Sequence, residues 1–323
     1  MEKPLLSVRN LVTRFRTGRG TITAVDHVSF DVAAGETVAI VGESGSGKSV
    51  TALSILRLIP DPPGQIESGE ILFDGQDLLK MSDAEIRAVR GDRIAMIFQE
   101  PMSSLNPSLT VGMQVGEPIN LHRKATWQVA LDKARELLGM VRMSDTASRV
   151  TAYPHQFSGG MRQRAMIAMA LACEPQLIIA DEPTTALDVT VQAQILDLLK
   201  DLADRTGSAL VLITHDLGVV ARYADRVVVM YAGRVVESAP AAELYARPRH
   251  PYTQGLMASV PRLDGDTSVR LVPIEGQPPD LARIPVGCAF APRCRQATDA
   301  CRSAPPPLRD IDHGHQVACI LEA

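Results

Sequence analysis

The sequence is poor in aromatic residues and has no long apolar run. Aromatic residues make up 4% of its 323 residues, with a single tryptophan. No apolar stretch approaches the roughly 18 residues that a membrane-spanning helix needs. The opening residues, Met1–Ser7, lack the long apolar core of a secretory signal. We therefore expect a cytoplasmic chain that reaches a membrane only peripherally, through a partner protein.

An excess of charge of one sign is also missing. The chain has 33 basic and 37 acidic residues, a net charge of −4. Broad contact with nucleic acid usually shows as a basic excess or patch, so we expect no nucleic-acid partner. With 46% apolar residues the chain can bury a substantial core. Its length allows one large domain with an appendage, or two modest domains.

A glycine-rich loop joins the apolar run Thr37–Val41 to a helical pattern over Val50–Leu58. It follows the pattern G-x-x-x-x-G-K-S, and its residues are Gly42, Glu43, Ser44, Gly45, Ser46, Gly47, Lys48 and Ser49, with Val50 next. Glycines let consecutive N–H groups point inward at a helix N-terminus and form an anion site. Lys48 would reach the β- and γ-phosphates, and Ser49 would complete the shell of a Mg²⁺ ion. A plain Gly/Ser turn is the alternative, but the strand–loop–helix context favours a nucleoside triphosphate site.

Two carboxylates follow a second apolar strand pattern, Leu177–Ala180. They are Asp181 and Glu182. In phosphate-loop NTPases such a strand end holds Mg²⁺, so we expect Asp181 to bind the ion through water and Glu182 to polarise the attacking water. A capping Asp-Glu pair before Pro183 is the alternative, which the upstream phosphate loop disfavours.

A second anion cradle precedes the helical pattern Met161–Cys173. Ser158, Gly159 and Gly160 put free N–H groups and a hydroxyl at that helix N-terminus. One chain with two cradles suggests that the second serves another subunit's nucleotide. In isolation the same residues would be an ordinary N-cap.

The remaining pattern predicts an α/β domain over 1–240. Two strands, Leu5–Phe15 and Thr23–Val32, suit an antiparallel subdomain. Between about 100 and 160 the spacing is helical without a comparable strand signal, which indicates a helical insertion. From 241 to 323 prolines are dense, and we call this segment the tail; its composition predicts an irregular, extended appendage.

Together these motifs resemble the nucleotide-binding cassette of ABC transporters, a RecA-like phosphate-loop NTPase fold. The resemblance covers residues 5–240 and includes Walker A (42–49), Walker B (ending at 181–182) and the signature (158–161). It identifies Gln99 as the Q-loop glutamine, Ala186–Asp188 as the D-loop, His215 as the switch histidine and Phe15 as the adenine platform. Met161 departs from the commonest signature, which has Gln there.

The resemblance implies further roles for these residues. Gln99 would touch Mg²⁺ or water, and His215 would hydrogen-bond the γ-phosphate and orient the attacking water. Two cassettes would close head to tail on ATP, each phosphate loop facing the partner's Ser158, Gly159 and Gly160. Hydrolysis would then drive two membrane permease subunits.

Motifs in the tail limit the resemblance to one subgroup of ABC transporter ATPases. Arg249–Leu256, Ile274–Asp280 and Gly287–Cys294 are similar to the oligopeptide/dipeptide/nickel importer ATPases, as is Gln99–Pro107 in the insertion. The resemblance implies an ATPase that powers uptake of di- or oligopeptides, paired with a second ATPase and a periplasmic or extracellular solute-binding protein. Nickel or another small solute stays open. So do two other classes, a soluble ABC ATPase acting on nucleic acid or ribosomes and a redox-sensing iron–sulfur protein.

Four of the five cysteines fall in the tail: Cys288, Cys294, Cys301 and Cys319. Their spacing lacks the tight C-x2-C pairs of zinc ribbons. Four thiolates can hold a tetrahedral metal ion or an iron–sulfur cluster. Related dipeptide-importer ATPases carry a [4Fe–4S] cluster at matching cysteines, so the resemblance implies one here, with zinc and free thiols as the alternatives. We expect its role to be structural.

Overall fold

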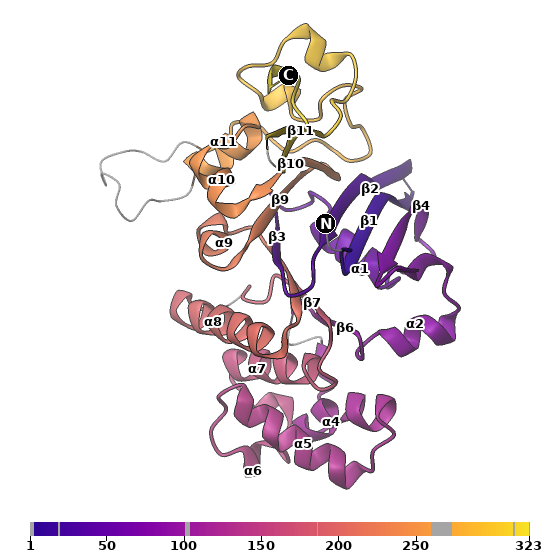
Figure 1. The fold of residues 1–323 in the computed structure, drawn as a ribbon, viewed down its shortest axis with the longest axis vertical. Helices are drawn as coiled ribbons and strands as arrows, with labels where there is room; N and C mark the ends of the chain where they lie inside the picture. The colour runs from indigo at the N-terminus through magenta and orange to yellow at the C-terminus, as the bar shows by residue number, and fades with distance from the viewer. Residues whose placement is uncertain are drawn as a thin grey trace. The chain divides into compact units, whose positions relative to one another are not determined.

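The computed structural model describes residues 3–18, 20–100, 104–185, 187–259, 273–312 and 314–322 (Figure 1). The chain forms two compact units. Unit 1 comprises Met1–Val32, Thr37–Leu79 and Thr214–Ala323, and unit 2 comprises Ala33–Glu36 and Lys80–Ile213. Among the described residues, every helix is too short or too polar to cross a membrane.

Unit 1 contains an antiparallel sheet. Its strands run in the order β2 (Gly20–Val32), β1 (Leu6–Thr17), β4 (Gly64–Phe73) and β5 (Gln76–Asp77). The two predicted N-terminal strands are confirmed within a few residues. Asp74 and Gly75 turn β4 into β5 with φ of 50° and 80°, the left-handed backbone that Asp-Gly turns favour.

Unit 1 also holds part of a mixed sheet. Its strands run in the order β11 (Arg309–Asp312), β12 (His315–Val317), β10 (Arg234–Pro240), β9 (Arg226–Tyr231) and β3 (Thr37–Val41), with β3 parallel to β9. Its helices include α1 (Lys48–Ile55), α9 (Leu217–Tyr223), α10 (Ala241–Ala246) and α11 (Pro251–Ala258). Strands β9 and β10 form an antiparallel hairpin. Every residue of β3 is buried, as its uninterrupted apolar run predicts.

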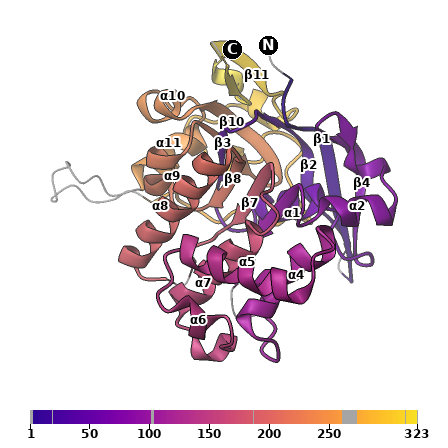
Figure 2. The same ribbon diagram turned by 60° about the horizontal axis from the view of Figure 1, so that its bottom comes forward.

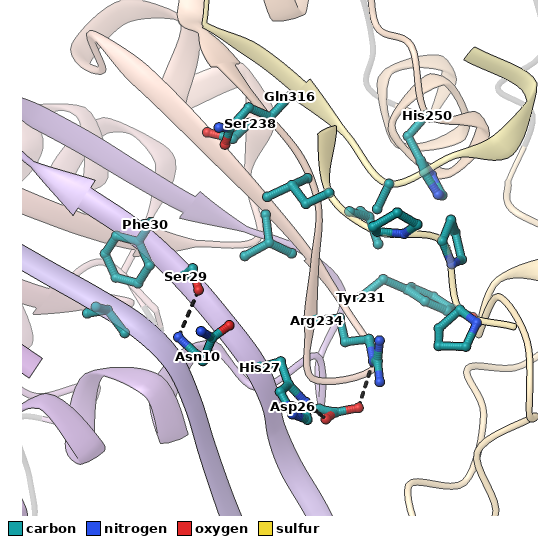
Figure 3. A pocket seen from close by; sticks show the side chains of 18 of the residues that line it. Asn10, Asp26, His27, Ser29, Phe30, Tyr231, Arg234, Ser238, His250 and Gln316 are labelled. Atoms are coloured by element: carbon teal, nitrogen blue, oxygen red, sulfur yellow. Dashed lines mark hydrogen bonds and ion pairs between the residues drawn. The ribbon is translucent and has the colours of Figure 1, made fainter. Parts of the chain in front are cut away.

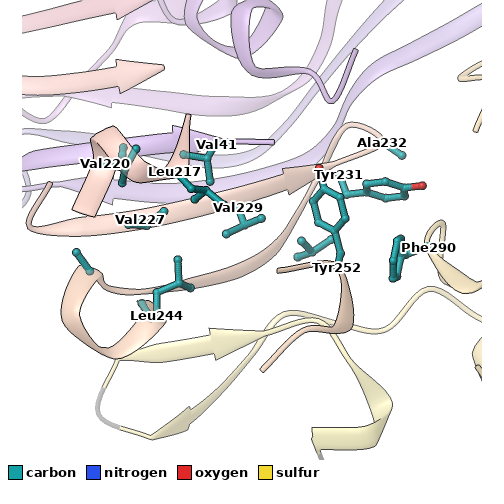
Figure 4. Packing of buried hydrophobic residues seen from close by; sticks show 14 residues of the cluster. Val41, Leu217, Val220, Val227, Val229, Tyr231, Ala232, Leu244, Tyr252 and Phe290 are labelled. Atoms are coloured by element: carbon teal, nitrogen blue, oxygen red, sulfur yellow. The ribbon is translucent and has the colours of Figure 1, made fainter. Parts of the chain in front are cut away.

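The core of unit 1 reaches into the tail (Figure 4). Val41 and Val229 from the sheet pack with Leu217 of α9 in one buried cluster. The same cluster contains Tyr252 of α11 and Phe290 of the tail, whose ring centroids lie 5.4 Å apart. The tail was predicted to be irregular and extended, but its described part includes the short elements α10, α11, β11 and β12, and this aromatic contact buries part of it in the core.

A buried carboxylate fastens the tail to β10. Glu237 is fully buried and accepts hydrogen bonds from the backbone N–H groups of Arg249 and His250, at 2.7 and 2.9 Å. Its Oε1 also lies 2.7 Å from Nε2 of His315 in β12. A buried carboxylate needs such partners, because an unpaired one would carry a large desolvation cost.

Unit 2 combines parallel strands with helices (Figure 2). The strands run in the order β8 (Ala209–Thr214), β7 (Leu177–Asp181) and β6 (Ile94–Ile97). The helices are α2 (Asp83–Val89), α4 (Val111–His122), α5 (Trp127–Met140), α6 (Thr146–Arg149), α7 (Gly159–Ala170) and α8 (Val189–Thr206). Ser82 and Glu85 form a capping box at the start of α2. The described part of 100–160 contains helices and no strand, as the sequence predicts.

The burial of His250 predicts a pH dependence of stability. Its side chain accepts a hydrogen bond from the Tyr252 N–H, and burial lowers its pKa from 6.5 to about 4. Between these values the unfolded chain binds a proton that the folded chain does not, so stability falls as pH falls below 6.5. We expect the titration of His250 to lower the free energy of unfolding by about 2 kcal/mol between pH 7 and pH 5, measured by denaturant unfolding.

The matched control is His250→Asn, which keeps a side-chain acceptor but does not titrate. The parent should lose more stability than this variant over the same pH range. Equal losses in the two proteins would contradict the assignment.

Candidate functional site

The predicted phosphate loop lies in unit 1 between β3 and α1. Two of its glycines are required by space and by backbone conformation. A Cβ at Gly42 would collide with the carbonyl oxygen of Met230, and one at Gly47 with that of Ala24. Gly47 also has φ of 100° at the N-cap of α1, a conformation that side chains disfavour. These glycines therefore let the loop curl tightly against neighbouring backbone.

Lys48 is held inside the loop. Its side chain is 4% exposed, and its ammonium group donates to the carbonyl oxygens of Gly42 at 2.8 Å and Glu43 at 3.0 Å. Ser44 and Gly45 at the tip of the loop are exposed, and Ser49 is half-buried in the first turn of α1. The loop thus places a cation and the first turn of a helix together, which suits an anionic ligand.

Neighbouring backbone and one tyrosine hold the loop from outside. Gly233 donates its N–H to the Ser46 carbonyl at 2.9 Å, and its own carbonyl accepts from Asp26 N–H at 2.8 Å. The Glu43 N–H donates to the hydroxyl of Tyr252 at 2.8 Å. Sequence reasoning missed Tyr252 as part of this site, because it lies 209 positions from Glu43. Its motif, Arg249–Leu256, indicated only the importer subgroup.

The predicted catalytic carboxylates lie in unit 2 at the end of β7. Asp181 is the last residue of the strand and is 5% exposed. Glu182 follows with φ of 46°. Its Oε2 accepts from Nε2 of Gln99 at 2.9 Å and from the hydroxyl of Thr185 at 2.9 Å. The structure therefore brings Gln99 and Glu182 together, because β6 and β7 are adjacent parallel strands. Thr185 was not predicted.

The predicted signature residues begin α7 in unit 2. Ser158 is the N-cap, and its hydroxyl accepts from the Met161 N–H at 3.3 Å. Ser158 and Gly159 are exposed. A Cβ on Gly159 would meet Leu187 at 3.5 Å, an ordinary contact, whereas one on Gly160 would press on Val191 at 3.0 Å. Packing within this chain therefore does not require a glycine at 159.

The other predicted residues occupy strand and helix ends. His215, the first residue after β8, belongs to unit 1 and is exposed. Phe15 is half-buried in β1 with its ring beside Gly64. In the D-loop, Asp188 caps α8 by accepting from the Val191 N–H at 3.0 Å. Ala186 lies outside the described residues, as do 101–103 of the Gln99–Pro107 stretch.

The four tail cysteines converge on one small cavity of about 20 Å³. It is lined by Cys288, Cys294, Cys301 and Cys319, together with His250 and Phe290. Among the described residues, no group of three or more His, Cys, Asp or Glu is placed closely enough to hold a metal ion as it stands.

The pKa values of these four thiols are shifted in different directions. Burial raises the pKa of Cys288, Cys294 and Cys319. The pKa of Cys301 is lowered, chiefly by its hydrogen bonds with the Thr298 side chain and N–H. Cys301 is therefore the thiol that ionises most readily, and a positive ion would be needed to keep all four as thiolates.

A larger cavity of about 870 Å³ in unit 1 shares His250, Cys288 and Phe290 with the cysteine cavity (Figure 3). Strands β1 and β2 and the tail line it, and Asp26 on its wall pairs with Arg234 at 2.6 Å. Among its described lining residues there is none from Gly42–Ser49. It is therefore a feature separate from the phosphate loop.

Comparison with known proteins gives the same assignment as the motifs. Residues 25–185 match the ABC transporter family, and residues 236–301 match the family described as "Oligopeptide/dipeptide transporter, C-terminal region". The chain is 55% identical over 98% of its length to a "Probable peptide ABC transporter ATP-binding protein" of Sinorhizobium fredii, 94% of which is covered. It is 52% identical over its whole length to the "Dipeptide transport ATP-binding protein DppD" of Bacillus subtilis, 96% of which is covered.

A solved structure supports the fold and the chemistry. A dimeric ATP-binding cassette in a post-hydrolysis state, bound to ADP and Pi, is 31% identical. It matches with a TM-score of 0.66 over 73% of this chain and 98% of its own. The predicted phosphate-loop fold and ATPase activity are thereby confirmed. The chain belongs to the ATP-binding subunits of ABC transporters, in the group that carries the oligopeptide/dipeptide C-terminal region.

Proposed function

We propose that this protein is the ATP-hydrolysing subunit of a peptide importer. It docks on the cytoplasmic face of the membrane with a second ATPase subunit, two permease subunits and a solute-binding protein. The observation that carries the proposal is the similarity along the whole chain, tail included, to relatives named for peptide and dipeptide transport.

The proposed roles of the site residues follow from their positions. In unit 1, the loop Gly42–Ser49 cradles the triphosphate and Ser49 binds Mg²⁺. In unit 2, Asp181 binds Mg²⁺ through water. Glu182 polarises the attacking water. The amide of Gln99 and the hydroxyl of Thr185 both donate to the same Glu182 oxygen.

Ser158 and Gly159 serve the nucleotide of a partner subunit. Both are exposed at the N-terminus of α7, where free N–H groups favour an anion. Packing within the chain leaves the glycine at 159 unexplained, whereas close approach of a partner's phosphates would explain it. The dimeric cassette with ADP and Pi supports this arrangement.

The four tail cysteines hold an iron–sulfur cluster of the [4Fe–4S] type. Their thiols line one cavity and provide four sulfur atoms, the number that such a cluster needs, but these atoms would have to move closer together to bind it. Thr298 supplies hydrogen bonds to Cys301, the kind of outer contact that tunes a thiolate ligand. When bound, the cluster would cross-link a segment too rich in proline to build its own core.

The test of transport uses cells that depend on this importer. Uptake of a labelled dipeptide should be lost when Lys48→Ala replaces the parent chain, because the loop loses its cation. Arg295→Ala, an exposed tail change, is the control and should transport normally. Dipeptide uptake that survives Lys48→Ala, with nickel uptake lost instead, would reject the peptide assignment.

Glu182→Gln tests the water-polarising role. We expect ATP binding to be retained and turnover to fall at least a hundredfold, since general-base assistance contributes about that much. Steady-state phosphate release and equilibrium ATP binding are the measurements. Glu174→Gln is a matched control, because Glu174 is exposed and also has a left-handed backbone, with φ of 53°. Comparable turnover in Glu182→Gln and the parent would remove Glu182 from this role.

Anaerobic purification tests the cluster. We expect a brown protein with about four iron and four sulfide per chain, and a visible absorbance band that Cys301→Ser weakens. Cys173→Ser is the control, since Cys173 is buried in unit 2 outside the tail. Stoichiometric zinc in a colourless protein would refute the cluster.

A further inference from the structure

An arginine of the tail forms an ion pair with the phosphate loop. The guanidinium of Arg293 faces the carboxylate of Glu43, the second residue of the loop, with two parallel contacts: Nη1 to Oε2 at 2.6 Å and Nη2 to Oε1 at 3.1 Å. The Arg293 side chain is only 5% exposed and that of Glu43 28%. A bidentate, largely buried pair is strong and directional, unlike the pairs of long side chains common on surfaces.

The tail holds Arg293 in place independently of Glu43. Arg293 donates to the carbonyl oxygens of Ile274 and Glu275, at 3.3 and 3.0 Å, and lies against the ring of Phe290. It ends a short 3-10 turn, Ala291–Arg293, immediately before Cys294. The guanidinium is thus positioned by the folded tail and presented to the loop.

The loop is held at Glu43 by both its backbone and its side chain. The Glu43 N–H donates to the Tyr252 hydroxyl, and Tyr231 Oη lies 3.3 Å from Arg293. Hydrogen bonding to Glu43 is the main cause that raises the pKa of Arg293, so the arginine stays charged. Glu43 therefore carries a compensated charge at the point where the loop begins.

We propose that Arg293 is a positioning residue of the ATP site, through which the tail fixes and neutralises Glu43 of the phosphate loop. This inference rests on the proposed assignment of Gly42–Ser49 as the triphosphate cradle. A triphosphate is highly anionic, and an unpaired carboxylate on the loop that binds it would repel it. Arg293 removes that repulsion and keeps the loop in its binding conformation without touching the nucleotide.

Replacing Arg293 should weaken ATP binding in a protein that still folds. We expect Arg293→Ala to raise the dissociation constant of a fluorescent ATP analogue about tenfold, a size typical of coupling between sites. Arg293→Lys keeps the charge but loses the bidentate fork, so it should recover part of the affinity. Arg295→Ala, two residues away with an exposed partner in Glu275, should bind as the parent does.

A second substitution separates charge compensation from a merely structural contact. In the Arg293→Ala background, Glu43→Gln removes the unpaired carboxylate, so ATP affinity should return toward that of the parent. If Arg293 only holds the tail against the loop, Glu43→Gln should not raise the ATP affinity of the Arg293→Ala variant. Melting temperatures measured alongside show whether each variant is folded at the assay temperature.

The outcomes distinguish this inference from the proposed function. If Lys48→Ala binds the ATP analogue normally, the assignment of the loop itself fails. If Lys48→Ala loses binding while folded Arg293→Ala binds as tightly as the parent, only the role of Arg293 is overturned. Failure of Glu43→Gln to restore affinity to Arg293→Ala would likewise overturn it.

Discussion

An anion site made of main-chain N–H groups depends on one constraint: the loop must keep the shape in which those groups point inward. Within the loop, the Ser46 N–H donates to the Glu43 carbonyl at 3.2 Å, and further contacts come from outside the loop. Here the hairpin turn at Gly233 supports Ser46, the Tyr252 hydroxyl supports Glu43, and Arg293 fixes the Glu43 carboxylate. The glycines at 42 and 47 serve the same constraint, since any side chain there would push the loop off this support.

The tail is part of this support, although its composition suggests a loose appendage. Four buried interactions order it. Phe290 packs with Tyr252 and Tyr231 in the core of unit 1, and Glu237 ties α11 and β12 to β10. Buried aromatic pairs each contribute about 0.5–1.5 kcal/mol beyond their burial. Once Phe290 is fixed, the turn that follows it places Arg293, and the cysteines around that turn come to line a common cavity.

Much of the fold could be predicted because its elements carry local signals. The apolar runs of β3 and β7, the Ser82–Glu85 capping box and the Asp74-Gly75 turn all lie within a few residues of sequence. The contact between Gln99 and Glu182 was also within reach, since each follows an adjacent buried strand. Helix ends were less exact: α7 begins at Gly159 rather than Met161, because Ser158 is the cap.

The sequence by itself determined the backbone of the loop Gly42–Ser49, the carboxylates after β7 and the Ser158 cap of α7, because each is a short motif of consecutive residues. Only the tertiary structure decided what holds the loop. Tyr252 and Arg293 lie 209 and 250 positions from Glu43, and no spacing rule connects side chains that meet through packing. The physical reason is that local hydrogen bonds form between residues that are neighbours in the sequence, whereas packing in the core brings together residues that are far apart in it.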